Sequence, residues 1–304
     1  MPPSEWPNLF VVGVVRGGTT SLADCLAQHP EIFMSPVKEP HFFTASEPPL
    51  TPVIKDEREY LDLFAGASEH LRGEASASYF ADPTAAPAIK RVSPDAKILV
   101  ILRDPIERAA SHYWHAVQYG REKRTFGDAV ADELAGRPRP GSPLYVRRGM
   151  YSGSLRQYLE IFGENVHVVF LEELTLRPQE QLMEVFRFLG VEEDVAERIT
   201  LLRLNAFRLP RPTTGRLVGS EVGRRIGRRL VPRRYRSHIE ALLFRAPERP
   251  PIDPTLRRVL NDAYEGDREP LERLLGRNVP WAFDLQPENP IVTRGDRQDT
   301  GDAD

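Results

Sequence analysis

The chain has 304 residues, of which 40% are hydrophobic, and its formal net charge is −3 at pH 7. This composition predicts a soluble globular protein with a sizeable core, and the weak net charge argues against bulk electrostatic binding of nucleic acid. No run is apolar for long enough to span a bilayer, and Glu5 and Pro7 stand where a secretory signal would need basic and apolar residues. We therefore expect a cytoplasmic protein. Its single cysteine, Cys25, has no partner for an internal disulfide.

Short apolar strands alternate with helices along the chain. The expected strands cover 9–15, 97–102 and 166–171. The expected helices cover about 20–28, 106–119 and 178–189. This alternation predicts an α/β fold, a P-loop-like three-layer sandwich whose central parallel sheet of about five strands is flanked by helices. In such a sheet, ligands bind at the carboxyl ends of the strands.

We expect one domain over residues 1–287 and a polar, disordered tail over 288–304. Within the domain, residues 203–236 are rich in arginine. Apolar side chains recur there every four residues, at Val218, Val222, Ile226 and Leu230. The pattern predicts a basic amphipathic helix with two open interpretations. It is either a solvated helix that covers a cleft, or a peripheral contact of 216–236 with an anionic membrane or another polyanion.

The first loop, GVVRGGTTS from Gly13 to Ser21, has the spacing of the phosphate-binding pattern G-x-x-x-x-G-K-[ST]. A glycine-rich turn at a helix N-terminus offers backbone N–H groups and the positive end of the helix dipole to a tetrahedral oxyanion. However, Thr19 replaces the lysine that neutralises the phosphates in ATP and GTP hydrolases. The nearest basic group is Arg16. The loop therefore predicts an anion site, although a tight strand-to-helix turn without a ligand is the alternative.

A second polar segment, LRDPIERAASHY from Leu102 to Tyr113, follows the second strand. Arg103 at the strand end and Ser111 two helical turns later can both face one phosphate. Together with residues 12–22, this segment resembles the donor-binding motifs of sulfotransferases that use 3′-phosphoadenosine 5′-phosphosulfate (PAPS). The resemblance covers about 8–215. It implies sulfuryl transfer from PAPS to a hydroxyl or amine by in-line displacement, with adenosine 3′,5′-bisphosphate (PAP) as the second product.

The resemblance also implies which residues bind the donor. They are Arg16, Gly17, Gly18, Thr19, Thr20, Ser21, Arg103, Ser111 and Arg211. Arg16 would also be catalytic, because it would stabilise charge on the bridging oxygen as PAP leaves. It stands where the family often has lysine, so it keeps the charge but cannot donate a proton. We expect donor binding to need no metal, because Arg16, Arg103 and the backbone amides supply positive charge.

A third segment, KEPHFF at 38–43, is similar to the E-x-H-F-F segment of glucosaminyl sulfotransferases that act on heparan sulfate. The resemblance implies that Glu39 is the catalytic base and that His41 orients the acceptor hydroxyl or the leaving group. Such a base is required because an alcohol is a poor nucleophile until its proton is taken in the transition state.

Residues 73–76 resemble a G-E-K-[ST] segment that contacts the acceptor side, but Ala75 replaces its lysine. This departure weakens the prediction of a heparan-like acceptor. We expect a carbohydrate or glycolipid acceptor, with specificity in loops such as 44–58 and 120–147. Residues 148–151 and 205–212 look like bacterial family segments near the same cleft.

Two other functions compete with a PAPS-dependent sulfotransferase of the EC 2.8.2 class. One is a divergent P-loop nucleotide kinase or NTPase, which Thr19 disfavours and which gives no reason for the pairing of Arg103 with Ser111. The other is a non-catalytic nucleotide-binding protein with the same fold. Metal interpretations are weaker. His112 and His115 lack a third ligand, and acidic residues at a helix start, such as those at 104 and 107, are common for dipole reasons.

Overall fold

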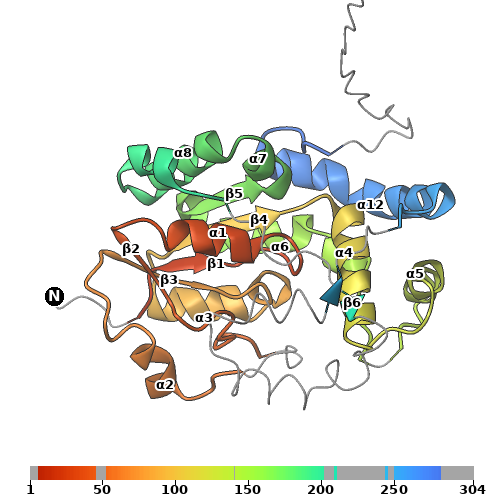
Figure 1. Ribbon diagram of the computed structural model, residues 1–304, viewed down its shortest axis with the longest axis horizontal. Helices are drawn as coiled ribbons and strands as arrows, with labels where there is room; N and C mark the ends of the chain where they lie inside the picture. The colour runs from red at the N-terminus through yellow and green to blue at the C-terminus, as the bar shows by residue number, and fades with distance from the viewer. Residues whose placement is uncertain are drawn as a thin grey trace, which may run out of the picture.

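The fold comes from a computed structural model (Figure 1). The structure describes residues 6–45, 53–139, 141–201, 209–210, 244–245 and 250–281. The predicted amphipathic helix at 216–236 and the predicted tail at 288–304 lie outside the described residues. Two short strands, β6 (Leu209–Pro210) and β7 (Phe244–Arg245), pair antiparallel.

Five parallel strands form the central sheet in the order β2-β3-β1-β4-β5. They are β1 (Leu9–Val11), β2 (Ile32–Met34), β3 (Leu71–Ala75), β4 (Lys97–Leu102) and β5 (Val166–Phe170). Strand β1 lies at the centre, between β3 and β4. The predicted parallel sheet is confirmed. The sequence analysis does not anticipate β2 and β3, because β2 is very short and β3 carries arginine, glycine and glutamate among its five residues.

Helices cover both faces and one end of the sheet (Figure 1). They are α1 (Thr19–Leu26), α2 (Glu57–Asp62), α3 (Ala85–Val92), α4 (Pro105–Gln118), α5 (Phe126–Leu134), α6 (Ser152–Phe162), α7 (Leu171–Leu176), α8 (Pro178–Leu189) and α12 (Pro254–Leu275). The helix predicted at 178–189 has these bounds, and the one predicted at 106–119 begins and ends one residue earlier. Within the part of the chain that the structure describes, no helix is both long and apolar enough to cross a membrane.

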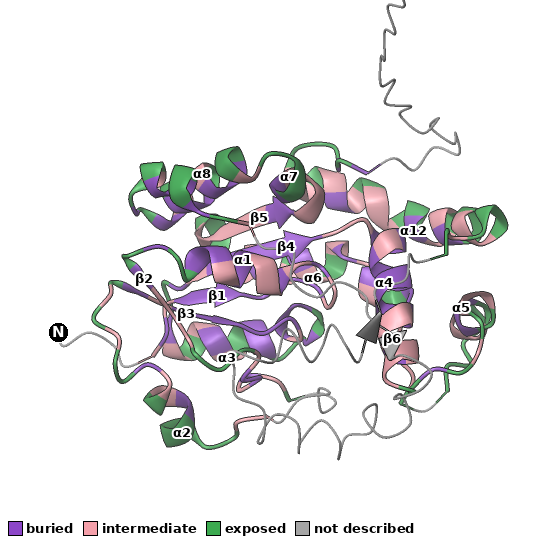
Figure 2. Ribbon diagram, in the orientation of Figure 1, coloured by how far each residue is buried: buried purple, intermediate pink, exposed green. Residues whose placement is uncertain are grey.

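The side chains of each central strand belong to two separate cores, because successive side chains point to opposite faces of a sheet. Leu9 and Val11 of β1 belong to a cluster with residues of α1 and α8, whereas Phe10 belongs to a cluster with residues of α3 and α6. The three side chains are fully buried. Figure 2 shows the buried strands between helices whose outer surfaces are exposed. This confirms the three-layer sandwich. Cys25 lies in the α1 cluster, and burial raises the pKa of its thiol to about 11.

The parallel strands bring four chain segments to one edge of the sheet. Strand β1 leads into loop 12–18, β2 into loop 35–45, β3 into segment 76–84, and β4 into Arg103. All the sequence-predicted site residues that the structure describes lie in these segments or in the helices α1 and α4 that follow β1 and β4. This is the edge at which open α/β sheets bind ligands.

Candidate active site

Loop 13–18 is packed so closely that a Cβ atom has no room at any of its three glycines. At Gly13 it would lie 2.2 Å from Ile101 Cγ2. A Cβ atom at Gly17 would lie 2.4 Å from Val14 Cγ2, and one at Gly18 would lie 2.7 Å from Leu171 Cδ1. Gly18 also has a φ of 103° and immediately precedes α1, whose N-terminus no side chain caps. The amides at this helix start, where Thr19 is buried and Thr20 and Ser21 are half-buried, therefore suit an anion.

Arg16 of the glycine turn meets two predicted donor residues from other segments, Arg103 and Ser111. The Nε of Arg16 donates a hydrogen bond to Ser111 Oγ over 3.2 Å, across 95 positions of sequence. The Nη1 of Arg103 donates to the carbonyl oxygen of Arg16 over 3.3 Å. Loop 13–18, the end of β4 and helix α4 thus meet at one place, with two guanidinium groups and a hydroxyl. The structure does not describe Arg211, the remaining predicted donor residue.

The backbone around Arg103 is held by residues that the sequence analysis did not assign. The hydroxyl of Tyr151 donates to the carbonyl oxygen of Arg103 over 2.9 Å. On the other side, the amide of Asp104 donates to Glu172 Oε1 over 3.0 Å. Tyr151 belongs to a segment that the sequence analysis did single out, but nothing in the sequence pairs it with Arg103. The contact arises only because α6 packs beside the end of β4.

Acidic residues at the start of α4 have structural partners. Asp104 Oδ1 accepts hydrogen bonds from the amides of Ile106 and Glu107, at 2.8 and 3.1 Å, and so caps the helix. Glu107 forms an ion pair with Arg257 of α12 at 2.6 Å. These contacts support the helix-start interpretation of the two carboxylates.

His112, next to Ser111 on α4, is buried among basic groups. Burial, together with the charges of Arg108 and Arg148, lowers its pKa well below the ordinary histidine value, so the imidazole is neutral. Arg108 Nη1 lies 3.5 Å from His112 Nδ1 and can donate to it. His112 therefore adds no charge of its own to the place where Arg16 and Ser111 meet.

Glu39 and His41 form the second half of the site. Glu39 Oε2 lies 3.6 Å from His41 Nε2, and Oε1 accepts from Lys38 Nζ over 3.3 Å. Burial alone would raise the pKa of Glu39, but the His41 hydrogen bond and the Lys38 charge lower it to about 2. The other ring nitrogen, Nδ1, lies 2.7 Å from Ser78 Oγ, which fixes the orientation of the buried His41 ring.

The backbone conformation singles out the same residues as the sequence motifs. Among the described residues, three non-glycine residues have a positive φ: Arg16 at 67°, Glu39 at 57° and His41 at 55°. They are the three residues predicted to be catalytic. The left-handed conformation costs a non-glycine residue about 1–2 kcal/mol, and such strain concentrates at functional sites. The coincidence supports a shared functional role for loops 13–18 and 39–45.

The two loops lie beside each other because β1 and β3 are neighbours. The amide of Ser76 donates to the carbonyl oxygen of Val11 over 3.2 Å, and the amide of Glu39 donates to that of Ala75 over 3.0 Å. Loop 39–45 is thus hydrogen-bonded to the end of β3, one strand away from the glycine turn. Adjacent strands are separated by about 4.8 Å, a spacing that suits groups acting on one small ligand.

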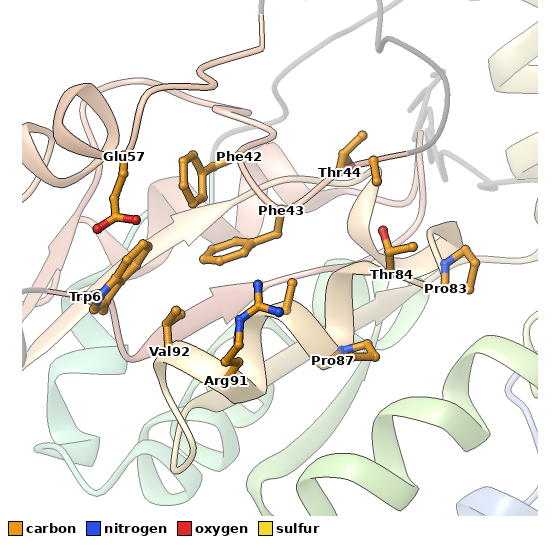
Figure 3. A pocket seen from close by; sticks show the side chains of 12 residues that line it. Trp6, Phe42, Phe43, Thr44, Glu57, Pro83, Thr84, Pro87, Arg91 and Val92 are labelled. Atoms are coloured by element: carbon orange, nitrogen blue, oxygen red, sulfur yellow. The ribbon is translucent and has the colours of Figure 1, made fainter.

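A pocket of about 670 Å³ runs beside loop 39–45 (Figure 3). Phe42 and Phe43 form one side, and Pro87 and Arg91 of α3 lie opposite. None of the predicted donor-binding or catalytic residues lines it. A much smaller pocket at the end of β1 includes Arg148. The larger cavity therefore lies beside the predicted chemistry and not at its centre.

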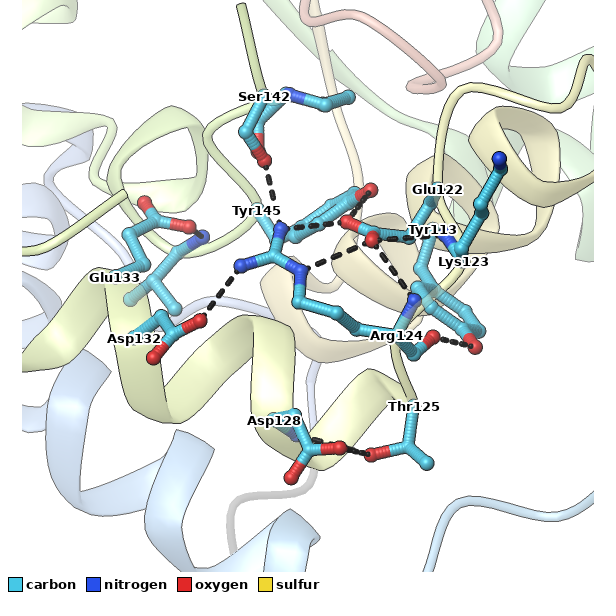
Figure 4. Close-up of polar contacts among 12 residues, drawn as sticks. Tyr113, Glu122, Lys123, Arg124, Thr125, Asp128, Asp132, Glu133, Ser142 and Tyr145 are labelled. Atoms are coloured by element: carbon cyan, nitrogen blue, oxygen red, sulfur yellow. Dashed lines mark hydrogen bonds and ion pairs between the residues drawn. The ribbon is translucent and has the colours of Figure 1, made fainter. Parts of the chain in front are cut away.

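An ion-pair network holds segment 120–147, one of the two loops expected to carry acceptor specificity (Figure 4). Arg124 contacts both oxygens of Glu122, at 3.0 and 2.7 Å, and also Asp132 Oδ2, at 2.8 Å. Hydrogen bonds from Arg124, opposed by burial, lower the pKa of Glu122 to about 2. Tyr145 donates to Glu122, and its carbonyl oxygen accepts from Arg108 of α4. The network thus connects this loop to the helix that carries Ser111.

The fold and this edge define a P-loop-like α/β protein with a glycine turn, whose geometry suits an anion, beside a carboxylate–histidine pair. Comparison with known proteins gives the family. The model of the sulfotransferase domain matches residues 7–211, and the chain belongs to this family. The resemblance seen in the motifs is confirmed, and with it the prediction of a sulfotransferase-class enzyme.

Individual relatives agree with this assignment. A crystal structure of a sulfotransferase from Alicyclobacillus acidocaldarius matches with a TM-score of 0.67 and 29% identity, over 90% of this chain and 97% of that one. Heparan sulfate glucosamine 3-O-sulfotransferase 3A1 of Mus musculus is 28% identical over 64% of this chain and 48% of its own length. Carbohydrate sulfotransferase 15 of Rattus norvegicus is 25% identical over 61% and 44%. The chain thus spans less than half of these two mammalian relatives.

Proposed function

We propose that the protein transfers a sulfuryl group from PAPS to a hydroxyl or amine of a carbohydrate or glycolipid. The observation that carries the proposal is the meeting of Arg16, Arg103 and Ser111 beside a strained Glu39–His41 pair. The two arginines and the serine supply the positive charge and the hydroxyl that a bisphosphorylated donor needs, and the Glu39–His41 pair supplies a base for an acceptor.

The donor assignment rests on the distribution of positive charge. Arg103 and Ser111 offer a guanidinium group and a hydroxyl to a 3′-phosphate, while the amides at the start of α1 offer donors to the 5′-phosphosulfate. An ATP-dependent mechanism needs a lysine at the position of Thr19. The two arginines and the amides account for the charge of the donor without a metal, so we propose metal-independent binding.

In the proposed reaction, Glu39 accepts the proton of the acceptor hydroxyl as its oxygen forms a bond to sulfur. The bond between sulfur and the bridging oxygen of the donor breaks on the opposite side, and PAP leaves with that bonding pair. Arg16 donates a hydrogen bond to the bridging oxygen as its charge grows. With a pKa of about 2, Glu39 is a weak base in the free protein. Proton transfer must therefore accompany the attack, when the hydroxyl has become more acidic.

The acceptor class rests on the relatives. Two of them are named as sulfotransferases of carbohydrate or of heparan sulfate glucosamine. This supports a sugar acceptor, whereas Ala75 in place of the family lysine sets this chain apart from heparan-type acceptor binding. Membrane contact through 216–236, a cytoplasmic location and the domain bounds 1–287 stay predictions.

Calorimetric titration tests the donor. We expect PAP to bind in a buffer containing EDTA, and Arg103→Ala to weaken that binding on the order of a hundredfold because a charged phosphate contact is lost. Magnesium-ATP serves as the comparison ligand. Preference for magnesium-ATP would support the NTPase alternative and overturn the proposal. Selective PAP binding without transfer to any sugar acceptor would instead support a non-catalytic nucleotide-binding protein.

A further inference from the structure

Glu74 is a fully buried carboxylate that the proposed reaction does not use. It lies on β3, in the middle layer of the fold, and its side chain is entirely removed from solvent. Burial raises its pKa, and hydrogen bonds from Ser76, Tyr60 and Tyr79 oppose that rise. Burying a carboxyl group is costly unless it is hydrogen-bonded. Its retention beside the predicted catalytic loop therefore needs an explanation.

Three hydroxyl groups surround this carboxyl group. Ser76 Oγ donates to Glu74 Oε2 over 2.6 Å. The hydroxyls of Tyr60 and Tyr79 both donate to Oε1, each over 2.7 Å. An ionised carboxylate only accepts hydrogen bonds, so it fixes the proton of each hydroxyl on the side that faces Glu74. The oxygen lone pairs of the same hydroxyls are then available in other directions.

With those lone pairs, two of the three hydroxyls accept hydrogen bonds from amides of loop 39–45. Ser76 Oγ accepts from the amide of His41 over 3.2 Å, and the Tyr79 hydroxyl accepts from the amide of Phe43 over 3.2 Å. Both amides flank Phe42 and are buried with their acceptors. Glu74 thus acts on the loop through two carboxylate–hydroxyl–amide relays, and its own hydrogen bonds are to Ser76, Tyr60 and Tyr79.

The relays are placed where the backbone is strained. His41 and Glu39 both have left-handed φ values, which neither residue adopts without support. Loop 39–45 has no strand ladder or helix to hold it. Four of its amides, those of Glu39, His41, Phe43 and Ala45, donate to residues of segment 75–82. Hydrogen bonds in a buried network polarise one another, so the contacts of each hydroxyl with Glu74 and with a loop amide strengthen one another.

We propose that Glu74 is a positioning residue. Through Ser76 and Tyr79 it holds the amides of His41 and Phe43, and so keeps the Glu39–His41 pair in the left-handed conformation needed for proton transfer. This inference rests on the proposed function for its catalytic consequence, but the relays themselves are a statement about this chain alone.

The third hydroxyl provides a matched control. Tyr60 donates to the same Glu74 oxygen as Tyr79, but no hydrogen bond joins the Tyr60 hydroxyl to loop 39–45. Tyr60→Phe, Tyr79→Phe and Ser76→Ala each remove one hydroxyl from Glu74. The two phenylalanine variants also keep their rings, including the stacking of residue 60 on Phe42 at a centroid distance of 4.3 Å. A general loss of stability is therefore separated from loss of a relay.

Hydrogen exchange followed by mass spectrometry on the full chain tests the relays without any assumption about activity. We expect peptides that cover residues 41–43 to exchange faster in Ser76→Ala and in Tyr79→Phe, whereas Tyr60→Phe exchanges like the wild type. In Glu74→Gln, the side-chain N–H of glutamine donates to a hydroxyl that donated to Glu74 in the wild type, so that this hydroxyl must reorient. We expect this variant to exchange like Ser76→Ala and Tyr79→Phe. Equal exchange in all variants would overturn the proposal.

Kinetics on the same variants test the catalytic consequence. We expect kcat for sulfuryl transfer from PAPS to fall roughly 10- to 100-fold in Ser76→Ala and Tyr79→Phe, because a misplaced base costs rate steeply. The dissociation constant for PAP should stay unchanged, and Tyr60→Phe should keep wild-type kcat. An equal loss of kcat in Tyr60→Phe would reduce Glu74 to a structural role. A wild-type protein that transfers no sulfuryl group would refute the proposed function, while the exchange experiment would still decide the relays.

Discussion

The two halves of the candidate site are held by different means. Loop 13–18 leaves the central strand and enters α1 at once, and glycines, a strand ladder and a helix start fix its shape. Loop 39–45 follows the short edge strand β2 and is held by side chains of segment 76–82. The geometry of the glycine turn therefore depends on the backbone, whereas that of the Glu39–His41 loop depends on buried polar side chains.

The two halves should therefore control different properties of the enzyme. A backbone-built anion site keeps its geometry when surface side chains change, as expected for a donor common to a family. A loop held by hydroxyls and one buried carboxylate loses its geometry when a single partner is removed. Donor binding and chemistry should therefore respond to separate sets of substitutions.

The largest expected effect separates the two halves directly. Replacement Glu39→Gln keeps the shape of the side chain but removes the base, and we expect kcat to fall on the order of a thousandfold. The affinity for PAP should stay within about twofold of wild type, because loop 13–18 is untouched. Steady-state kinetics and calorimetry on the same preparation check both parts. A large loss of PAP affinity would show that the halves are not independent.

A smaller effect is expected from the donor loop. Gly18→Ala forces a φ of 103° on alanine and places its Cβ 2.7 Å from Leu171 Cδ1. Gly120→Ala is the matched control, since its φ is 69° and no atom lies within 4 Å of the added Cβ. We expect both variants to lose about 1–2 kcal/mol of unfolding free energy to the left-handed conformation, and Gly18→Ala to lose more because Leu171 must move.

Denaturant unfolding and PAP titration measure this pair of variants. PAP binding should weaken about tenfold in Gly18→Ala and remain normal in Gly120→Ala, since only the former moves the amides at the start of α1. If the two variants unfold alike and bind PAP alike, the close packing of Gly18 does not set the anion site.

The smallest effect concerns the pH dependence of Glu39 in loop 39–45. With a pKa of about 2, against an ordinary value of 4.5, Glu39 stays ionised as the solution is acidified. In a profile of kcat/KM against pH, we therefore expect no decline between about pH 5.5 and 4 from protonation of Glu39. Lys38→Met removes a charge that lowers this pKa, so the pH at which kcat/KM declines on the acid side should move upward from about 2 but stay below the ordinary value, because the His41 hydrogen bond remains.

The same shift affects stability with a definite sign. A depressed carboxyl pKa stabilises the folded state above the unfolded value, and this contribution is lost as the pH falls from 4.5 toward 2. The Lys38→Met variant should lose less stability than the wild type over that window. Thermal unfolding at a series of pH values measures it, and parallel curves for the two proteins would contradict the role of Lys38.

Much of the donor half could be predicted from the sequence, since a glycine turn between an apolar strand and a helix is a local pattern. The position of Ser111 about two helical turns beyond Arg103 could be predicted, and the structure adds that Arg16 contacts both residues. The roles of Glu39 and His41 in loop 39–45 were predicted through a motif alone. Strand β3, which supports it, carries Arg72, Gly73 and Glu74 and has no apolar alternation to reveal it.

The α/β class, the glycine turn, the strand-end arginine and the motif that contains Glu39 and His41 can all be recognised in the sequence, because each depends on residues close together in the chain. The contact of Arg16 with Ser111 across 95 positions, and the support of the His41 and Phe43 amides by Glu74 through two hydroxyls, are visible only in the folded protein. Those contacts depend on the strand order, which places β3 and β4 on either side of β1. Strand order is set by how helices bury both faces of the sheet, and no local pattern encodes it.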